Sequence, residues 1–158
     1  MAQPITILVG TMTGTAELVA DEVKSVLEGS GRKVEILAMD HLDAGVFARP
    51  GLFLVCTSTY GQGDVPDNAQ AFLSDLKERR PDLGHVRYGV IGLGDSTYFD
   101  TYCNGGRQFD ELLAELGAAR IGERLDHNAS GPDLPEDAGA AWAADWLGLL
   151  DEAEQAAA

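Results

Sequence analysis

Three threonines and two glycines stand together near the start of the chain, in the stretch Gly10-Thr11-Met12-Thr13-Gly14-Thr15. Hydroxyl groups and the N–H groups of a helix start can converge on an anion, and the positive end of the helix dipole favours negative charge there. Because the stretch contains no Lys or Arg, it does not match the loop that binds a nucleoside triphosphate with magnesium. The pattern predicts a site for a single phosphate held by neutral donors. The alternative is an ordinary helix cap at Thr13 or Thr15.

A second polar stretch lies between two apolar runs near the middle of the chain and combines hydroxyl residues, glycines and one aromatic ring. Gly61 and Gly63 allow its backbone to approach a flat ligand closely. Tyr60 stands between the hydroxyl residues and these glycines, where its ring can stack on another aromatic system. At the end of the stretch, Asp67 or Asn68 is expected to cap the next helix.

A third polar stretch contains three aromatic residues within five positions, namely Tyr98, Phe99 and Tyr102. This composition is unusual for a segment that only connects two elements. Two aromatic loops can hold a planar ring between them while a phosphate attached to that ring lies in the first stretch. The order of the three stretches therefore predicts a site for a planar ligand with a phosphate tail.

Short apolar runs alternate with amphipathic segments along the chain, which predicts strands alternating with helices. Trp142 and Trp146 are expected to face the core from the last helix, because residues four apart share one helix face. The predicted strands are residues 4–9, 34–37, 52–56, 88–93 and, more weakly, 120–125. The predicted helices are residues 15–27, 68–79, 107–116 and 138–150.

This order of elements predicts an α/β fold, a doubly wound five-stranded parallel sheet with helices on both faces. We expect a single domain over residues 1–158, with a frayed tail at 153–158. In such sheets ligands bind past the carboxyl ends of the strands, near the point where the strand order reverses. The three polar stretches follow the first, third and fourth predicted strands and should therefore meet at this edge.

The chain carries a formal net charge of −15 at pH 7, and 45% of its residues are hydrophobic. Its negative charge argues against nucleic acid and membrane surfaces as partners and favours a protein with a basic face. No apolar run is long enough to cross a bilayer, and the N-terminus lacks the pattern of a signal peptide. Cys56 and Cys103 form no CxxC pair, and His41, His85 and His127 show no metal-ligand spacing. We expect a cytoplasmic protein without a metal site.

At the three stretches the sequence resembles the flavodoxin family. Residues 11–17 are similar to the family's phosphate loop, Thr/Ser-x-Thr-Gly-x-Thr/Ala. Residues 58–68 resemble the second FMN loop in the FMN domains of sulfite and cytochrome reductases, and residues 92–98 resemble the third. The length, and the segment 135–137 that leads into a helix with two tryptophans, are most similar to short flavodoxins of the MioC type. The resemblance implies a flavodoxin-like sheet with the strand order 2-1-3-4-5.

The resemblance also implies non-covalently bound FMN, with Tyr60 on one face of the flavin and Tyr98 on the other. The third stretch is one residue longer than in the relatives, so Phe99 is the alternative stacking residue. Residues 126–128 match the family's last flavin loop only loosely. The phosphate would lie at Thr11, Thr13, Gly14 and Thr15. The full implied set is Thr11, Met12, Thr13, Gly14, Thr15, Thr57, Ser58, Thr59, Tyr60, Gly61, Gly63, Leu93, Gly94, Asp95, Tyr98, Phe99, Tyr102 and Cys103.

In function, the resemblance implies a monomeric electron carrier that takes electrons from a flavoprotein reductase and passes them to an acceptor redox enzyme. No residue pattern indicates a base beside a substrate site, which favours a carrier over an enzyme. The alternatives are an FMN-dependent NAD(P)H:quinone reductase and a flavin-free interaction module of the same fold. A signalling receiver domain does not fit, because the predicted strand ends lack its acidic residues and its Lys.

Four acidic residues, Asp64, Asp67, Asp95 and Asp100, stand near the implied flavin rim and could steer a basic reductase face. The alternative is that they cap turns in solvent. Negative protein charge and aromatic walls disfavour further negative charge on the flavin, so its second electron should require a strong reductant. Cys103 is expected to be a buried inert thiol, and the alternative is a redox-active one.

Overall fold

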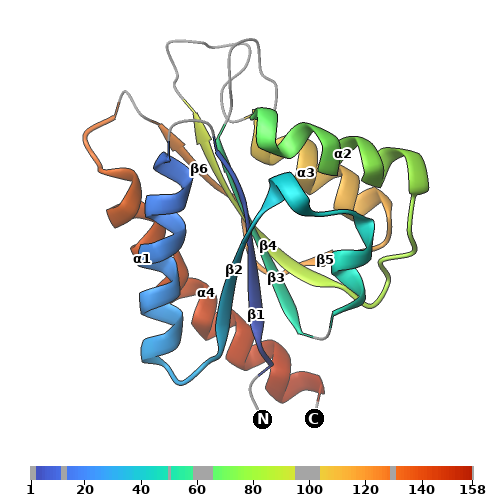
Figure 1. The fold of residues 1–158 in the computed structure, drawn as a ribbon. Coiled ribbons are helices and arrows are strands. Elements are labelled where there is room, and N and C mark those ends of the chain that lie inside the picture. The colour runs from blue at the N-terminus through green and yellow to red at the C-terminus, as the bar shows by residue number, and fades with distance from the viewer. Residues whose placement is uncertain are drawn as a thin grey trace.

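The computed structural model of the chain describes residues 3–11, 14–49, 51–58, 66–94, 104–128 and 131–157. Within them a parallel sheet has the strand order β2-β1-β3-β4-β5, and a further short strand, β6, also pairs with β4 (Figure 1). The predicted α/β class and strand order are confirmed. The strands are β1 Ile5–Gly10, β2 Val34–Ala38, β3 Leu52–Ser58, β4 Arg87–Gly94, β5 Ala119–Arg120 and β6 Leu125–Asn128. The helices are α1 Thr15–Gly29, α2 Asp67–Arg79, α3 Asn104–Glu115 and α4 Pro135–Ala157, with the 3-10 turns η1 Met39–His41 and η2 Ala44–Ala48 after β2.

Helices cover both faces of the sheet, α1 and α4 on one face and α2 and α3 on the other (Figure 1). The side chains of β1 alternate between these two layers. Ile5 and Ile7 pack in the core with α1 and α4, whereas Leu8 packs in the core with α2 and α3. Every residue of β1 is buried, because a strand covered on both faces has no solvent side. This double cover is why the strands appear in the sequence as continuous apolar runs.

The fifth predicted strand is wrong as a continuous element, because it is divided into β5 and β6. The chain turns between them at Gly122, whose φ of +75° favours glycine. Helix α4 satisfies two carbonyl groups of this interruption. The indole N–H of Trp142 donates to the Glu123 oxygen at 3.0 Å, and that of Trp146 donates to the Ile121 oxygen at 2.9 Å. Hydrogen bonds from a helix thus take the place of part of a strand.

Both tryptophans face the core, as predicted, Trp146 fully buried and Trp142 half-buried. Their rings stack with centroids 5.2 Å apart. Gly89 of β4 makes room for them, since a Cβ at this position would lie 2.8 Å from Trp142 and 2.9 Å from Trp146. The helix that carries them is longer than predicted, and it continues to Ala157, past residue 153 where the sequence predicts a frayed tail.

A buried charged network ties α3 to the outer strands of the sheet. Asp110 of α3 accepts the hydroxyl of Tyr88 at 2.7 Å, and its carboxylate also pairs with Arg120 and, at 3.1 Å, with Arg124. Burial raises the pKa of Tyr88, and the hydrogen bond to Asp110 raises it further, so the hydroxyl remains a donor at neutral pH. A carboxylate is tolerated in this position because it is both paired and hydrogen-bonded.

Glycines let the starts of α2 and α3 approach the ends of the strands. A Cβ on Gly10, the last residue of β1, would lie 3.1 Å from the Cβ of Ala69 in α2. A Cβ on Gly106 of α3 would lie only 2.8 Å from the Cα of Gly92 in β4. Helix α3 begins before its predicted start at Arg107. The sequence predicts a later start because glycine is a poor helix former, whereas the close packing on β4 requires a glycine at position 106.

We predict that Gly106→Ala lowers the free energy of unfolding by about 1–3 kcal/mol, because the new methyl group would meet backbone atoms that cannot move aside. Helix propensity alone predicts the opposite sign, a gain of up to about 1 kcal/mol. Gly148→Ala in α4 is the matched control, since a Cβ there meets nothing within 4 Å, and it should stabilise the protein. Urea unfolding measures both changes, and a stabilising Gly106→Ala would contradict the close packing of α3 on β4.

Candidate functional site

The carboxyl ends of β1, β3, β4 and β6 form one edge of the sheet, at the top of Figure 1. This edge brings the predicted site residues Thr57 and Ser58 of β3 beside Leu93 and Gly94 of β4. The polar stretches that follow β1, β3 and β4 therefore start from neighbouring strands, as the sequence predicts. One row of paired residues is Gly10, Thr57, Gly92 and Asp126, and the rows beyond it hold Ser58, Leu93 and His127, then Gly94 and Asn128.

The first stretch joins β1 to α1, and its described residues lie at the N-terminus of that helix. The hydroxyl oxygen of Thr11 accepts the N–H of Gly14 at 3.0 Å. Gly14 is the N-cap of α1 with a φ of +89°, a left-handed conformation that favours glycine. The carbonyl of Gly14 accepts the first hydrogen bond of the helix, from the N–H of Leu18 at 3.1 Å. The N-cap is thus neither Thr13 nor Thr15, and the interpretation of the stretch as an ordinary threonine cap is wrong.

This arrangement supplies neutral donors to an anion. A threonine hydroxyl that accepts one hydrogen bond, as Thr11 does, still has its own proton to donate. The first N–H groups of α1 have no carbonyl partner inside the helix, and the helix dipole adds partial positive charge at the same place. Glu17, the acidic residue of the first turn, is exposed. The donor set fits a phosphate group bound without a basic side chain.

Asn68 connects the first stretch to the start of α2. Its Oδ1 accepts the N–H of Thr11 at 2.9 Å, and its Nδ2 lies 3.5 Å from the Val9 carbonyl and 3.4 Å from a carboxylate oxygen of Asp40. The N-cap of α2 is Pro66, and Asn68 stands inside the first turn. The prediction of a capping role is therefore wrong for Asn68, while the side chain of Asp67 lies outside the described residues. No local sequence pattern predicts this contact between Thr11 and Asn68, which are 57 positions apart.

Arg124 holds β6 at the same edge. Its guanidinium binds Asp126 at 2.8 Å and Asp110 at 3.1 Å. Burial lowers the pKa of Arg124, but the carboxylates of Asp126 and Asp110 more than offset this effect, so its pKa is raised and the group stays charged. Asp126 lies against β4, 3.3 Å from the position of a Cβ on Gly92. Residues 126–128, matched only loosely in the sequence, therefore lie at the same edge of the sheet as the candidate site.

Cys56 lies in β3 beneath the start of α1 and is fully buried. Its thiol donates toward the carbonyl oxygen of Ala16 at a distance of 3.5 Å. Burial raises the pKa of the Cys56 thiol to about 12. Thiolate chemistry is suppressed under these conditions, so Cys56 acts as a small apolar residue that supports the first turn of α1.

Most of the residues predicted to surround the planar ring lie outside the described residues. The described residues that precede them, Ser58 and Gly94, end adjacent strands. The positions of Asp64 and Asp100 also lie outside the described residues, so a steering role for them stays a prediction. The undescribed members of the predicted set are Met12, Thr13, Thr59, Tyr60, Gly61, Gly63, Asp95, Tyr98, Phe99, Tyr102 and Cys103.

A groove of about 500 Å³ lies between α1 and strand β2. Its charged lining is mostly acidic, with Glu17, Asp21 and Glu35 outnumbering Lys24, and so it suits a phosphate poorly. In the part of the chain that the structure describes, no three His, Cys, Asp or Glu side chains are grouped so that they could hold a metal ion. The helices of that part are too short or too polar to cross a membrane.

The family of the chain is decided by a match along most of its length. The family model described as Flavodoxin matches residues 7–142, from β1 into α4. The chain belongs to the flavodoxin family. Flavodoxin YqcA of Escherichia coli (strain K12) is 41% identical over 146 residues, which cover 92% of this chain and 97% of that protein. Protein MioC of the same strain is 40% identical over 152 residues, with the same coverage of 92% and 97%.

Two further comparisons agree with this membership. The sulfite reductase [NADPH] flavoprotein alpha-component of Bacillus subtilis (strain 168) is 37% identical over 127 residues, which cover 80% of this chain and 21% of that larger protein. The solved structure of a mutant of flavodoxin from Pseudomonas aeruginosa superimposes with a TM-score of 0.80 at 36% identity, covering 94% of this chain and 99% of that one. The predicted family, flavodoxin-like fold and FMN cofactor are confirmed. The hydroxyl and N–H donors at the start of α1 fit the phosphate of FMN.

We predict that Cys56 of a Cys103→Ser variant reacts with a disulfide reagent at pH 8 at least about a hundredfold more slowly in the folded protein than in urea. The reason is that burial keeps the thiol protonated. The raised pKa also makes the free energy of unfolding depend on pH. The thiol of the unfolded chain loses its proton near pH 8.5, whereas the thiol of the folded protein keeps its proton up to about pH 12. The stability that Cys56 contributes is therefore complete below about pH 8.5 and is lost as the pH rises toward 12. Rapid labelling of the folded variant would contradict this account.

Proposed function

We propose that this chain is a one-FMN electron carrier that takes electrons from an NADPH-dependent flavoprotein reductase and delivers them to an acceptor redox enzyme. One observation carries the proposal: three polar stretches with the composition of FMN loops begin at adjacent strand ends, after Gly10, Ser58 and Gly94. A single ligand of the size of FMN can be reached from all three. Membership in the flavodoxin family supports the same function.

In the proposed site, the hydroxyls of Thr11 and Thr15 hold the phosphate together with the first N–H groups of α1, and Gly14, whose N–H is directed to Thr11, shapes the turn. These donors are neutral, so the phosphate charge is balanced by hydrogen bonds and the helix dipole instead of by a cation. The ring would lie beyond Ser58 and Gly94, between Tyr60 and either Tyr98 or Phe99. The proposal includes Cys103 and Tyr102 as neighbours of the ring.

FMN, when bound, accepts and donates electrons one at a time, and the protein sets how readily it does so. The chain's own contribution is to disfavour negative charge at this edge of the sheet. Its net charge of −15 and the carboxylates near the edge repel further negative charge, and this repulsion is stronger where water is excluded. A flavin held here should therefore be a strong donor once it is fully reduced. The sequence shows no pattern of a base beside a substrate site, which favours a carrier.

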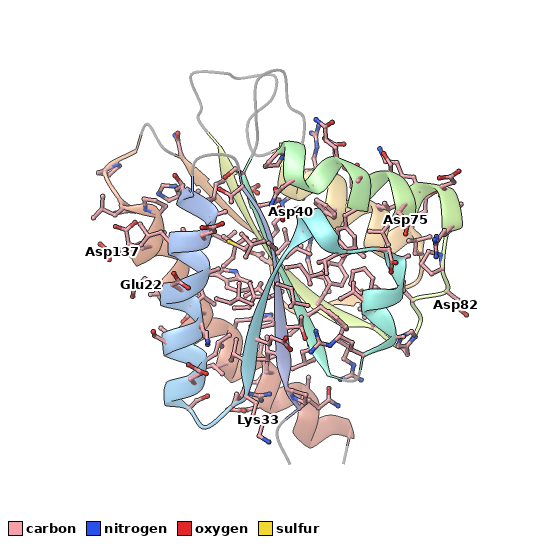
Figure 2. The ribbon with its side chains drawn as sticks, viewed as in Figure 1. Glu22, Lys33, Asp40, Asp75, Asp82 and Asp137 are labelled. Atoms are coloured by element: carbon pink, nitrogen blue, oxygen red, sulfur yellow. The ribbon has the colours of Figure 1, made fainter. Side chains whose placement is uncertain are left out.

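The proposed partners present a basic face to the edge that holds FMN. Exposed carboxylates supply the complementary charge: Glu17 in the first turn of α1 and Asp137 in the first turn of α4. Figure 2 shows Asp137 and Glu22 on the side of α1 and α4, and Asp40 beside the start of α2. We further propose that the carrier works as a monomer. We also propose a cytoplasmic location, because two cysteines outside any disulfide pattern are typical of a reducing compartment.

We predict that a double variant, Glu17→Gln with Asp137→Asn, lowers the second-order rate of electron transfer from an NADPH-dependent flavodoxin reductase by roughly two- to fivefold at low salt. The loss should shrink as salt rises, because the Debye length falls to about 8 Å near physiological ionic strength. Glu28→Gln is the control, since Glu28 is an exposed residue at the opposite end of α1. Stopped-flow reduction of the FMN-loaded protein measures the rate, and a rate independent of salt would contradict electrostatic steering.

A second experiment, without the reductase, distinguishes a carrier from a quinone reductase. Without the reductase, NADPH and a quinone should show no steady turnover with the FMN-loaded protein. Steady NADPH oxidation under these conditions would favour the enzyme and contradict the carrier.

A further inference from the structure

We propose that Asn68 is a positioning residue for the phosphate of FMN, acting through the backbone of Thr11 and without touching FMN itself. This inference rests on the proposed function and adds a residue that the sequence pattern assigns to a helix cap. In this proposal, the start of α2 determines the shape of the phosphate site at the start of α1.

Three hydrogen bonds run in series from Asn68 to the first turn of α1. The Oδ1 of Asn68 accepts the N–H of Thr11 at 2.9 Å, and the hydroxyl oxygen of Thr11 accepts the N–H of Gly14 at 3.0 Å. The carbonyl of Gly14 then accepts the N–H of Leu18 at 3.1 Å. Each bond fixes the residue that makes the next one, so the orientation of Thr11 decides where α1 begins.

The first bond also determines which donors remain for an anion. Because the N–H of Thr11 is directed to Asn68 and the N–H of Gly14 to Thr11, neither is directed to the phosphate. The hydroxyl proton of Thr11 is left to donate, since its oxygen serves as the acceptor for Gly14. Without the acceptor at Asn68, the N–H of Thr11 would compete for a new partner and the hydroxyl would lose its fixed direction.

The other contacts of Asn68 favour an amide at this position over a carboxylate. Its Nδ2 lies 3.4 Å from a carboxylate oxygen of Asp40 and 3.5 Å from the carbonyl of Val9, so its amide group lies between two acceptors. An aspartate would keep the acceptor for Thr11 but lose these donors. It would also add negative charge beside Asp40 and near the proposed phosphate.

Helix α2 is seated on the sheet by packing that does not involve the Asn68 side chain. Ala69 of α2 lies against Gly10, where a Cβ would be 3.1 Å from the Ala69 Cβ and also 3.1 Å from the sulfur of Met39. Phe72 and Leu76 of the same helix are fully buried. Removing the Asn68 amide should therefore leave α2 in place and remove only the hydrogen bonds of this side chain, of which the one to Thr11 is the shortest.

The test compares two ligands that differ only in the phosphate, FMN and riboflavin, on the wild type, Asn68→Ala and the control Ser74→Ala. Ser74 is an exposed residue later in α2. We expect Asn68→Ala to weaken FMN binding about tenfold and riboflavin binding less than about twofold, because only the phosphate contacts depend on Thr11. Ser74→Ala should change neither. Fluorescence titration measures both dissociation constants, and the visible spectrum and two midpoint potentials of bound FMN should be unchanged in Asn68→Ala.

Equal losses for FMN and riboflavin would overturn the inference, because they would make Asn68 a general structural residue. Unchanged FMN binding would overturn it as well. Where riboflavin binds the wild type too weakly to measure, altered midpoint potentials in Asn68→Ala would count against it, and unaltered potentials with weakened FMN binding would support it. Failure of the wild type to bind FMN would instead contradict the proposed function, so the two failures are distinguishable.

Discussion

The candidate site depends on the close approach of two helix starts to the ends of two buried strands. At Gly10 and Gly106 there is no room for a side chain, because a Cβ on Gly10 would lie 2.6 Å from the Thr57 hydroxyl and 3.1 Å from the Cβ of Ala69, and one on Gly106 would lie 2.8 Å from the Cα of Gly92. A larger residue at either position would press against the start of α2 or of α3. The glycines weaken the elements that contain them, and the packing they permit outweighs that loss.

Hydrogen bonds and ion pairs then fix what the packing brings together. On one side of the edge, Asn68, Thr11 and Gly14 form a neutral relay that ends at the start of α1. On the other side, Arg124 joins the buried Asp110 to Asp126 and so anchors β6 beside β4. The neutral relay lies where the phosphate is expected, and the charged pairs lie at the opposite border of the edge. This separation suits FMN, because its phosphate end is anionic and its ring is expected to lie where further negative charge is disfavoured.

Periodicity and turn residues predicted most of the fold, because strands such as β1 and β3 are buried on both faces and appear as apolar runs. The failures have physical causes. The fifth strand is divided because Trp142 and Trp146, distant in sequence, supply hydrogen bonds at the break. The start of helix α3 was predicted too late, because Gly106 disfavours a helix locally although its contact with Gly92 requires a glycine there. The bridging role of Asn68 was missed because a capping residue and a long-range acceptor have the same local pattern. The phosphate site at the first stretch could be predicted because its hydroxyls and glycines are adjacent in sequence.

The central claim is that this edge of the sheet holds one FMN in a protein that carries electrons. Its most direct test is a reductive titration of the protein with FMN, followed by visible absorbance against dyes of known potential. We expect one FMN bound per chain and two separate one-electron steps, the second at a lower potential than that of free FMN. No FMN binding, or a second step no lower than that of free FMN, would contradict it.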